Sequence, residues 1–258
     1  MNFISLTFVF SFPVVVLLYW KIPWKHRELF LLAVSYFFYI KESSWAGGLL
    51  LLTTAITYLA GIAVEKGRHR RAWLILAVTV CLGFLIGLKY SVPPVGISFY
   101  TFQTMAYVID VYRGEISAEK SPLSYALFVS FFPQILQGPI STYSQLAHQL
   151  YEPHSLSFKN FKHGSELILW GVFKKLVIAD RAWATLSMFM EDVYSYNGTI
   201  VTFMVLLYAL QLYADFSAGI DISRGIAQIF GIDMIDNFRR PYFAVSLGDY
   251  WRRWHISL

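Results

Sequence analysis

The chain has 258 residues, of which 57% are hydrophobic and 14% charged, with a formal net charge of +5 and a mean hydropathy of +0.51. Soluble domains carry about 25% charged residues, so this composition excludes an ordinary soluble protein. The excess apolar surface must face lipid or other membrane helices, and we expect an all-α fold, a polytopic transmembrane helix bundle. The basic residues lie in short loops between apolar runs, as in membrane proteins, so no nucleic-acid partner is expected.

Residue usage disfavours disulfide, metal and nucleotide sites. The one cysteine, Cys81, lies in an apolar run, which rules out a disulfide framework or a cysteine-based metal site and favours a small packed residue over a thioester carrier. Three histidines between residues 148 and 163 have irregular spacing and no H-E-x-x-H pattern, so we expect no metal. No glycine-rich phosphate loop or dinucleotide fingerprint is present, which disfavours a nucleotide-driven pump.

The first 90 residues contain four apolar runs that predict membrane-embedded helices. They are Phe3–Trp20, Leu29–Ile40, Gly47–Val64 and Trp73–Leu88. Basic loops at 21–28 and 65–72 fall on the same side if all four runs cross the bilayer. The positive-inside rule then puts these loops and the charged loop 113–120 in the cytoplasm and the N-terminus outside.

The middle of the chain predicts less regular structure. Pro93 and Pro94 interrupt the helical pattern at Ser91–Val95, and Gly96–Tyr112 is the next apolar run. Pro133, Gly138 and Pro139 interrupt the run 122–140, which predicts a broken or re-entrant helix. Such backbone is tolerated at membrane depth only when it is buried in protein or lines a cavity.

Polar stretches divide the later part of the chain. Ser141–His163 is expected to be a loop. Ser165–Ala179 is amphipathic and either lies in the interface plane or lines a cavity; its Lys174 and Lys175, with the pair at 180–181, are expected to meet lipid head groups or nearby loops. Thr199–Ala214 is a clear span that 215–230 continues or follows after a bend, and Pro241 is placed to open a further helix.

The residues whose burial in a membrane costs the most free energy lie between residue 211 and the end of the chain. Asp215, Asp221 and Arg224 interrupt apolar sequence, and ionisable groups at membrane depth normally face a polar interior and mark function. Asp221 and Arg224 are three residues apart and are expected to form an internal ion pair. Asp215 is expected to be a polar link between helices, with a direct catalytic role as the alternative.

The tail Asp249–His255 concentrates aromatic and basic side chains. If it is helical, Trp251, Arg252 and His255 share one face. Arginine and imidazole together can stabilise a developing oxyanion and move a proton. The alternative is an interfacial belt of tryptophan and arginine with a bystander histidine.

Three segments resemble the membrane-bound O-acyltransferase (MBOAT) family, near its alginate O-acetyltransferase branch. They are PVGISFYTFQTMAYVIDVYRGEI (Pro94–Ile116), FVSFFPQILQGPI (Phe128–Ile140) and the run Tyr213–Leu258. The resemblance covers the chain from Gly96 onward, whereas the N-terminal spans match only in character. It implies a single membrane-embedded acyltransferase domain, with spans in 1–90 and the motif region in 96–258.

The resemblance also implies a function in a bacterial cytoplasmic membrane. An acyl group, in this branch acetyl, passes from a cytoplasmic thioester donor (acetyl-CoA or acyl carrier protein) to a hydroxyl of an exported polysaccharide such as alginate. Other polysaccharide-acetylation proteins act as partners, and no cofactor is bound. His255 in WRRWHISL matches the upstream member of a family pair whose invariant histidine would lie beyond Leu258. The motif region is therefore expected to be incomplete, and the chain alone inactive.

Two other functions remain open on the residues alone. One is a non-enzymatic transporter or acyl conduit with Asp215, Asp221 and Arg224 along its path. The other is a structural subunit of a polysaccharide-export complex. For an enzyme, the predicted site comprises His255 as the catalytic residue, and it also includes residues that bind substrate or line the cavity, namely Asp215, Asp221, Arg224, Trp251 and Arg252.

Overall fold

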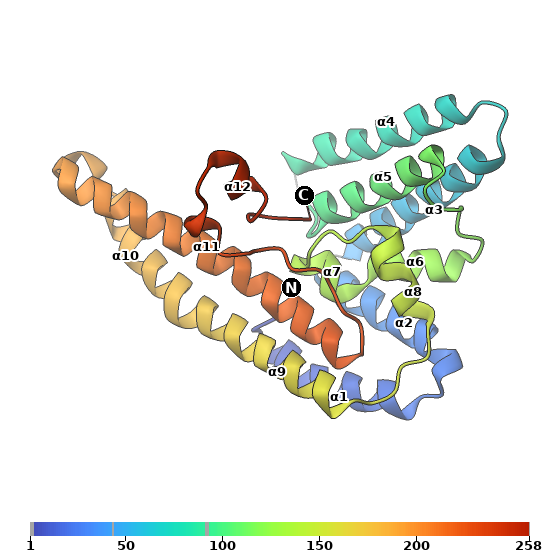
Figure 1. Ribbon diagram of the computed structural model, residues 1–258, viewed down its shortest axis with the longest axis horizontal. Helices are drawn as coiled ribbons and strands as arrows, with labels where there is room; N and C mark the ends of the chain where they lie inside the picture. Colours follow the sequence, from blue (N-terminus) through green and yellow to red (C-terminus); the bar gives the residue numbers. More distant parts are fainter. Residues whose placement is uncertain (1–2, 43, 91–92, 258) are drawn as a thin grey trace.

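The computed structural model describes residues 3–42, 44–90 and 93–257, and every named element in these ranges is helical (Figure 1). In chain order these elements are α1 (Leu6–Lys21), α2 (Trp24–Glu42), α3 (Ser44–Lys66), α4 (Arg70–Lys89), α5 (Ile97–Arg113), α6 (Pro122–Ser130), α7 (Phe132–Gln137), α8 (Tyr143–Tyr151), α9 (Phe158–Phe173), the π-helix η1 (Lys174–Ala179), α10 (Asp180–Met190), the 3₁₀ turn η2 (Val193–Ser195), α11 (Gly198–Ile229), the 3₁₀ turn η3 (Pro241–Phe243) and α12 (Leu247–Trp251). This architecture confirms the all-α prediction.

Three described helices are long and apolar enough to cross a bilayer, namely α3, α4 and α11. The apolar helix α1 is shorter, at 16 residues. The 32 residues of α11 form one continuous helix without the bend that the sequence left open. At about 1.5 Å per residue, this helix is longer than the roughly 30 Å of a hydrocarbon core.

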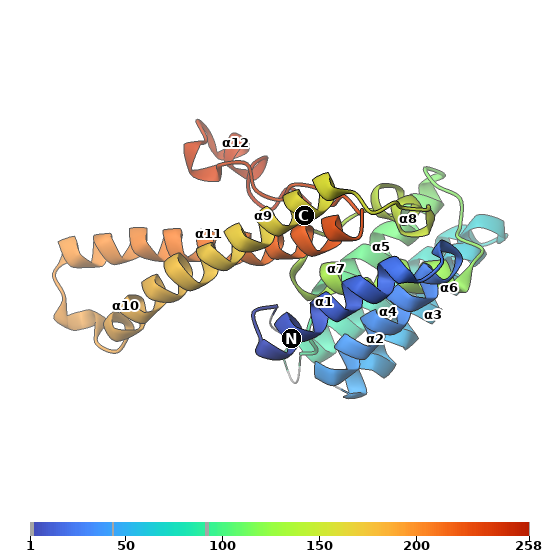
Figure 2. The ribbon, with the colours of Figure 1, turned by 90° about the horizontal axis from the view of Figure 1, so that it is seen from below.

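The elements form two groups that lie side by side (Figures 1 and 2). Helices α1–α8 pack into one bundle. Helix α9, η1 and α10 run as one rod, which turns at η2 and returns as α11; in Figure 2 this hairpin extends beyond the bundle. Phe230 at the end of α11 joins the groups, since its ring packs on Phe12, Tyr19 and Phe132 of the bundle.

The predicted break in 122–140 is confirmed. Phe131 leaves helical geometry between α6 and α7, with φ −50° and ψ 109°. Backbone groups near the break find side-chain partners: Ser35 Oγ accepts the N–H of Phe132 at 3.1 Å, and Gln103 Nε2 donates to the carbonyl of Phe128 at 3.0 Å. All of these residues are buried, which is the condition for non-helical backbone at membrane depth.

The prediction of a loop over Ser141–His163 is wrong in part, because α8 and the start of α9 lie within it. Thr142 and Gln145 form a reciprocal capping box at the start of α8, and Ser157 caps α9 by accepting the N–H of Asn160. These caps satisfy backbone donors that would otherwise be unpaired. Short polar helices of this kind have caps but no long apolar pattern, so hydropathy alone overlooks them.

The basic loops predicted to share one side do lie at the same end of the bundle, at the right of Figure 1. Antiparallel packing of α1 to α4 produces this arrangement. The predicted interruption at Ser91–Val95 falls partly on residues 91–92, which lie outside the described residues. Gly96 follows it and caps α5 with φ +74°, a backbone conformation that favours glycine.

Glycines bring α9 and α11 into close approach. A Cβ at Gly164 would lie 2.6 Å from the carbonyl oxygen of Gly225, and a Cβ at Gly225 would lie 2.5 Å from that of Gly164. About two helical turns further along, a Cβ at Gly171 would lie 2.8 Å from the carbonyl oxygen of Ala218. Small residues let membrane helices pack backbone to backbone, so these positions set the distance between the two helices.

We expect Gly225→Ala to lower the free energy of unfolding by about 1–3 kcal/mol, because the added methyl group overlaps α9. Thermal unfolding of the purified chain in detergent measures this change. Gly83→Ala in α4 is the matched control, since nothing lies within 4 Å of its Cβ position, and it should not lower stability. Equal stability of the two variants would contradict the close packing.

Candidate functional site

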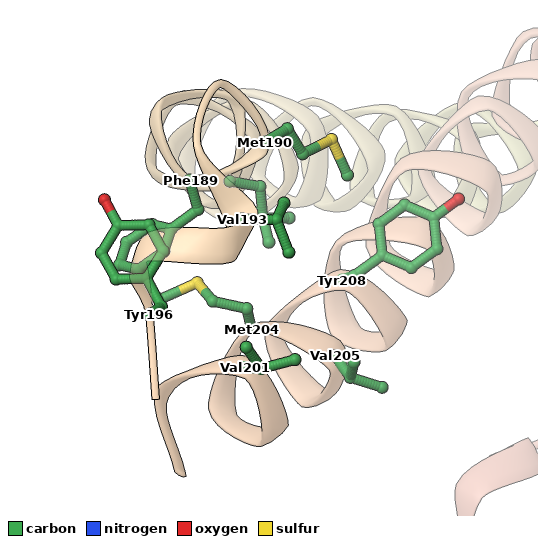
Figure 3. Close-up of a pocket in the computed structure, with 9 residues that line it drawn as sticks. Phe189, Met190, Val193, Tyr196, Val201, Met204, Val205 and Tyr208 are labelled. Atoms are coloured by element: carbon green, nitrogen blue, oxygen red, sulfur yellow. The ribbon is translucent and has the colours of Figure 1, made fainter. Parts of the chain in front are cut away.

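One cavity is wholly apolar and lies at the far end of the helical hairpin (Figure 3). Its volume is about 200 Å³. Figure 3 shows side chains from the end of α10, from η2 and from the start of α11 pointing toward one another. Its lining residues are Leu186, Phe189, Met190, Val193, Tyr196, Val201, Met204, Val205 and Tyr208. This lining has no acid, base or nucleophile suited to acyl transfer.

A second cavity, of about 450 Å³, is polar and lies between the hairpin and the C-terminal tail. In the structure the tail is the whole segment after α11, residues 230–257. We call the cavity the basic pocket. It is lined by Trp170, Lys174, Tyr213, Ser217, Ile220, Asp221, Arg224, Asn237, Phe238, Arg239, Arg240 and Arg253. Five of these side chains are basic and one is acidic, so the pocket is suited to an anion.

Lys174 is the most deeply buried cation of the basic pocket, with its side chain 8% exposed. Its ammonium group lies 2.7 Å from Asp221 Oδ2 and donates to Ser217 Oγ at 2.8 Å. Both partners belong to α11, so the contact joins the two arms of the hairpin. A buried charge must be paired in this way, and removing one partner would leave the other uncompensated.

Lys175 makes the neighbouring link. Its Nζ lies 2.7 Å from Asp215 Oδ1 and 2.9 Å from Asp180 Oδ1. The π-helical turn η1 begins at Lys174 and lets two consecutive lysines both reach aspartates of α11; single π turns often occur at functional sites. Asp215 is therefore a polar link between helices, as the sequence predicted. The predicted lipid or loop partners of these lysines are wrong, because their partners are aspartates.

The predicted ion pair between Asp221 and Arg224 is also wrong. Asp221 pairs with Lys174 instead, and Arg224 Nη1 lies 2.6 Å from Asp236 Oδ1. Arg224 Nε also donates to the carbonyl of Met234 at 3.1 Å. Asp221 and Arg224 are three residues apart on α11, but tertiary packing supplies each of them with a different partner. Arg224 consequently fixes the segment after α11, which forms one wall of the basic pocket.

The tail contributes three arginines to the basic pocket. Arg253 Nε donates to Asp249 Oδ1 at 2.9 Å, and this bond lowers the pKa of the Asp249 carboxyl. Arg239 and Arg240 have no ion pair with any residue that the structure describes. Arg240 has φ +48°, which is unusual and strained for a residue other than glycine. The two adjacent arginines leave positive charge facing the pocket.

Asn237 holds the tail in place and is 1% exposed. Its Oδ1 accepts the N–H of Ser257 at 2.8 Å, and its carbonyl accepts the N–H of Ile256 at 3.0 Å. Asn237 is among the lining residues of the basic pocket, and its buried Nδ2 has no hydrogen-bond partner in the described part of the chain. Buried polar atoms are nearly always bonded, so this unpaired donor is an exception beside the pocket.

His255 lies next to the basic pocket but is not among its lining residues. Its ring is half-buried and packs on Phe216, with ring centroids 4.9 Å apart. Burial lowers the pKa of the imidazole from its usual range, which favours the neutral form near pH 7. Its Nδ1 is buried and unbonded within the described ranges, and its φ is +49°. Strained backbone of this kind is concentrated at functional sites.

The predicted helical face of Trp251, Arg252 and His255 is wrong, because α12 ends at Trp251. Residues 253–257 instead run antiparallel to 237–239, with a bridge between Phe238 and Trp254. Backbone pairing with 237–239 prevails over the local helical pattern. Trp251 is 62% exposed and Arg252 is also exposed; neither lines the basic pocket.

The structure therefore brings together two of the predicted residues, Asp221 and Arg224, in one cavity. It adds Arg239 of the basic tail, and it adds Lys174 and Asn237, to which the sequence assigned no site role. The pair of lysines in an apolar helix was a usable signal for Lys174, because an unpaired charge there is costly. Among the described residues, no group of three histidine, cysteine or acidic side chains is placed to hold a metal ion.

Comparison with known proteins gives a consistent relationship. Residues 114–258 match the model of the membrane-bound O-acyltransferase family. The chain is 33% identical to the probable alginate O-acetylase AlgI of Pseudomonas fluorescens over 100% of this chain and 54% of that protein. It is 31% identical to the peptidoglycan O-acetyltransferase of Helicobacter pylori, covering 90% and 53%. It is 26% identical to the teichoic acid D-alanyltransferase of Bacillus subtilis, covering 63% and 42%.

The chain spans about half the length of the curated relatives it matches. Its spans and broken helix are those of a multi-pass membrane protein. More than half of its residues match the family model, and the resemblance first seen in three motifs extends over the whole chain. The chain belongs to the membrane-bound O-acyltransferase family.

Proposed function

We propose that the protein moves an acetyl group from a cytoplasmic thioester donor toward a hydroxyl of an exported polysaccharide, such as alginate, in a bacterial inner membrane. The N-terminus is then outside. The observation that supports this most is the basic pocket beside a half-buried histidine. The names of the relatives, which include an alginate O-acetylase and a peptidoglycan O-acetyltransferase, favour a polysaccharide acceptor.

The transfer forms a bond between the acceptor oxygen and the acetyl carbon and breaks the thioester C–S bond. The hydroxyl proton leaves as the oxygen attacks, and the departing thiolate takes up a proton. A neutral imidazole suits both proton steps near pH 7. In this proposal His255 orients the substrate or polarises its carbonyl, and a histidine beyond Leu258, implied by the family resemblance, is the base.

The basic pocket receives the phosphate-bearing part of the donor. Coenzyme A and the prosthetic arm of an acyl carrier protein both carry phosphate groups. Arg239 and Arg240 supply positive charge, and Asn237 Nδ2 supplies a hydrogen-bond donor. Asp221 and Arg224 support the pocket walls through their ion pairs.

Three residues of the predicted site, Asp215, Trp251 and Arg252, lie outside the lining of the basic pocket. Asp215 holds the hairpin arms together outside the pocket lining, through Lys175. Trp251 and Arg252 are exposed and remain proposed substrate contacts only at the outer surface of the tail. A role for Arg252 in donor binding is separable from that of Arg239 by mutation.

The chain forms the N-terminal portion of a single membrane-embedded acyltransferase domain in this proposal. Residues 1–90 supply the N-terminal spans, and 96–258 supply the motif region. Other polysaccharide-acetylation proteins complete the transfer to the polymer.

We expect Arg239→Gln to weaken binding of acetyl-CoA by about tenfold, because one unpaired positive charge in a partly enclosed pocket is lost. Titration of the purified chain with acetyl-CoA, at fixed ionic strength, measures the dissociation constant. Arg181→Gln, at an exposed arginine of α10 outside the pocket lining, is the matched control and should bind as the unmodified chain does. If the two variants bind acetyl-CoA equally well, the donor does not occupy the basic pocket.

We expect the 258-residue chain, in liposomes with acetyl-CoA, alginate and the other polysaccharide-acetylation proteins, to form no acetyl esters. The expected reason is that the base, in this proposal, is a histidine outside these 258 residues. In the full-length Pseudomonas fluorescens relative, Ala in place of the residue aligned with His255 should cut ester formation at least a hundredfold. Unchanged ester formation there would reduce His255 to a packing role, and turnover by the 258-residue chain would contradict its predicted inactivity. A non-enzymatic conduit would form no ester in either protein.

A further inference from the structure

A second positively charged cavity lies far along the chain from the basic pocket, at the loop between α3 and α4. Its volume is about 730 Å³, and we call its lining residues the loop patch: Arg68, His69, Arg70, Arg71, Ala72, Ile75 and Tyr112. Both flanking helices are candidate spans. The loop that joins two such spans must lie at a membrane surface, where lipid head groups are its neighbours.

One arginine of the loop patch has a structural role. Arg70 Nε donates to the carbonyl of Val64 at 2.9 Å, and its Nη2 donates to that of Tyr112 at 2.8 Å. Its guanidinium therefore satisfies the carboxyl ends of α3 and α5 and also lies over the Tyr112 ring, 5.6 Å from the centroid. These contacts fix the shape of the cavity.

For Arg68 and Arg71 the structure records no comparable hydrogen bonds to described residues. Both are exposed, and neither has an ion pair with a residue that the structure describes. The nearby acidic groups are engaged elsewhere: Glu65 Oε1 accepts the N–H of Ala118 at 2.8 Å, and Glu115 pairs with Arg113 at 3.3 Å. The two arginines therefore carry charge that no neighbouring carboxylate neutralises.

Apolar side chains continue from the charges toward the membrane interior. Ile75 is 54% exposed within the same cavity, and Trp73 beside it is 44% exposed. Tryptophan is enriched at the level of the head groups. The surface thus places cationic groups at the end of the span and an apolar wall along α4, which is the order of groups in a phospholipid.

We propose that the loop patch binds an anionic phospholipid. The phosphodiester head group meets Arg68 and Arg71, and an acyl chain lies along Ile75 of α4. The site is independent of the basic pocket, which lies between the hairpin and the tail. Its function is to hold a lipid at one membrane surface of the bundle, beyond the proposed acyl transfer.

The test is native mass spectrometry of the purified chain in detergent, titrated with phosphatidylglycerol. Each surface arginine contributes about fivefold to binding of an anionic membrane surface, so the double variant Arg68→Ala/Arg71→Ala should bind roughly 30-fold more weakly. Lys21→Ala/Lys25→Ala is the matched control, because it removes two cations from another loop at the same end of the bundle. This control should bind as the unmodified chain does, and circular dichroism should show equal helix content in all three proteins.

Two further arms identify what is recognised. Phosphatidylcholine should bind weakly and equally to all three proteins, and inorganic phosphate should not compete at millimolar concentration, since it lacks the acyl chains. The proposal is overturned if the double variant retains phosphatidylglycerol binding, or if the control loses as much as the double variant. It is also overturned if phosphatidylcholine binds as tightly as phosphatidylglycerol, or if inorganic phosphate displaces the lipid.

Discussion

The ion pairs between η1 and α11 are the interaction on which the polar part of this molecule depends. Lys174 with Asp221, and Lys175 with Asp215, place four charges between two helices whose backbones meet at Gly164. Each charge would be costly in an apolar environment alone, and each is tolerable because its partner is opposite. The close packing and the ion pairs support each other, since the glycines set the helix separation that the lysines bridge.

The basic pocket follows from this hairpin and from the way the tail returns to it. Asn237 binds the backbone of residues 256–257, and Arg224 binds the segment after α11 through Asp236. These contacts hold Arg239 at the pocket and His255 against Phe216. Two non-glycine residues of the tail, one of them His255, have strained positive φ angles. Tertiary contacts must therefore outweigh local backbone preference across the proposed site.

Sequence patterns predicted the positions of the helices better than the interaction partners of the charged side chains. Apolar length identified α3, α4 and the continuous core of α11, and prolines identified the break at Phe131. The capped helix α8 was missed, because a nine-residue helix held by a capping box has no long hydrophobic period. The sequence indicated that Asp221 and Arg224 are energetically costly to bury, and their local spacing predicted an ion pair between them. In the structure Asp221 pairs with Lys174 and Arg224 pairs with Asp236.

The sequence by itself determined that this protein is a helical membrane protein, where its long apolar helices and the break at Phe131 lie, and which ionisable residues demand partners. These properties depend on local hydropathy, helix-breaking residues and the cost of charge in an apolar medium. The tertiary structure alone decided that Lys174 meets Asp221, that Asn237 anchors the tail, and that His255 lies outside any helix. Those contacts join segments 20 to 47 residues apart, and their geometry depends on the register of α9 against α11 and on the fold of the tail, which no local pattern encodes.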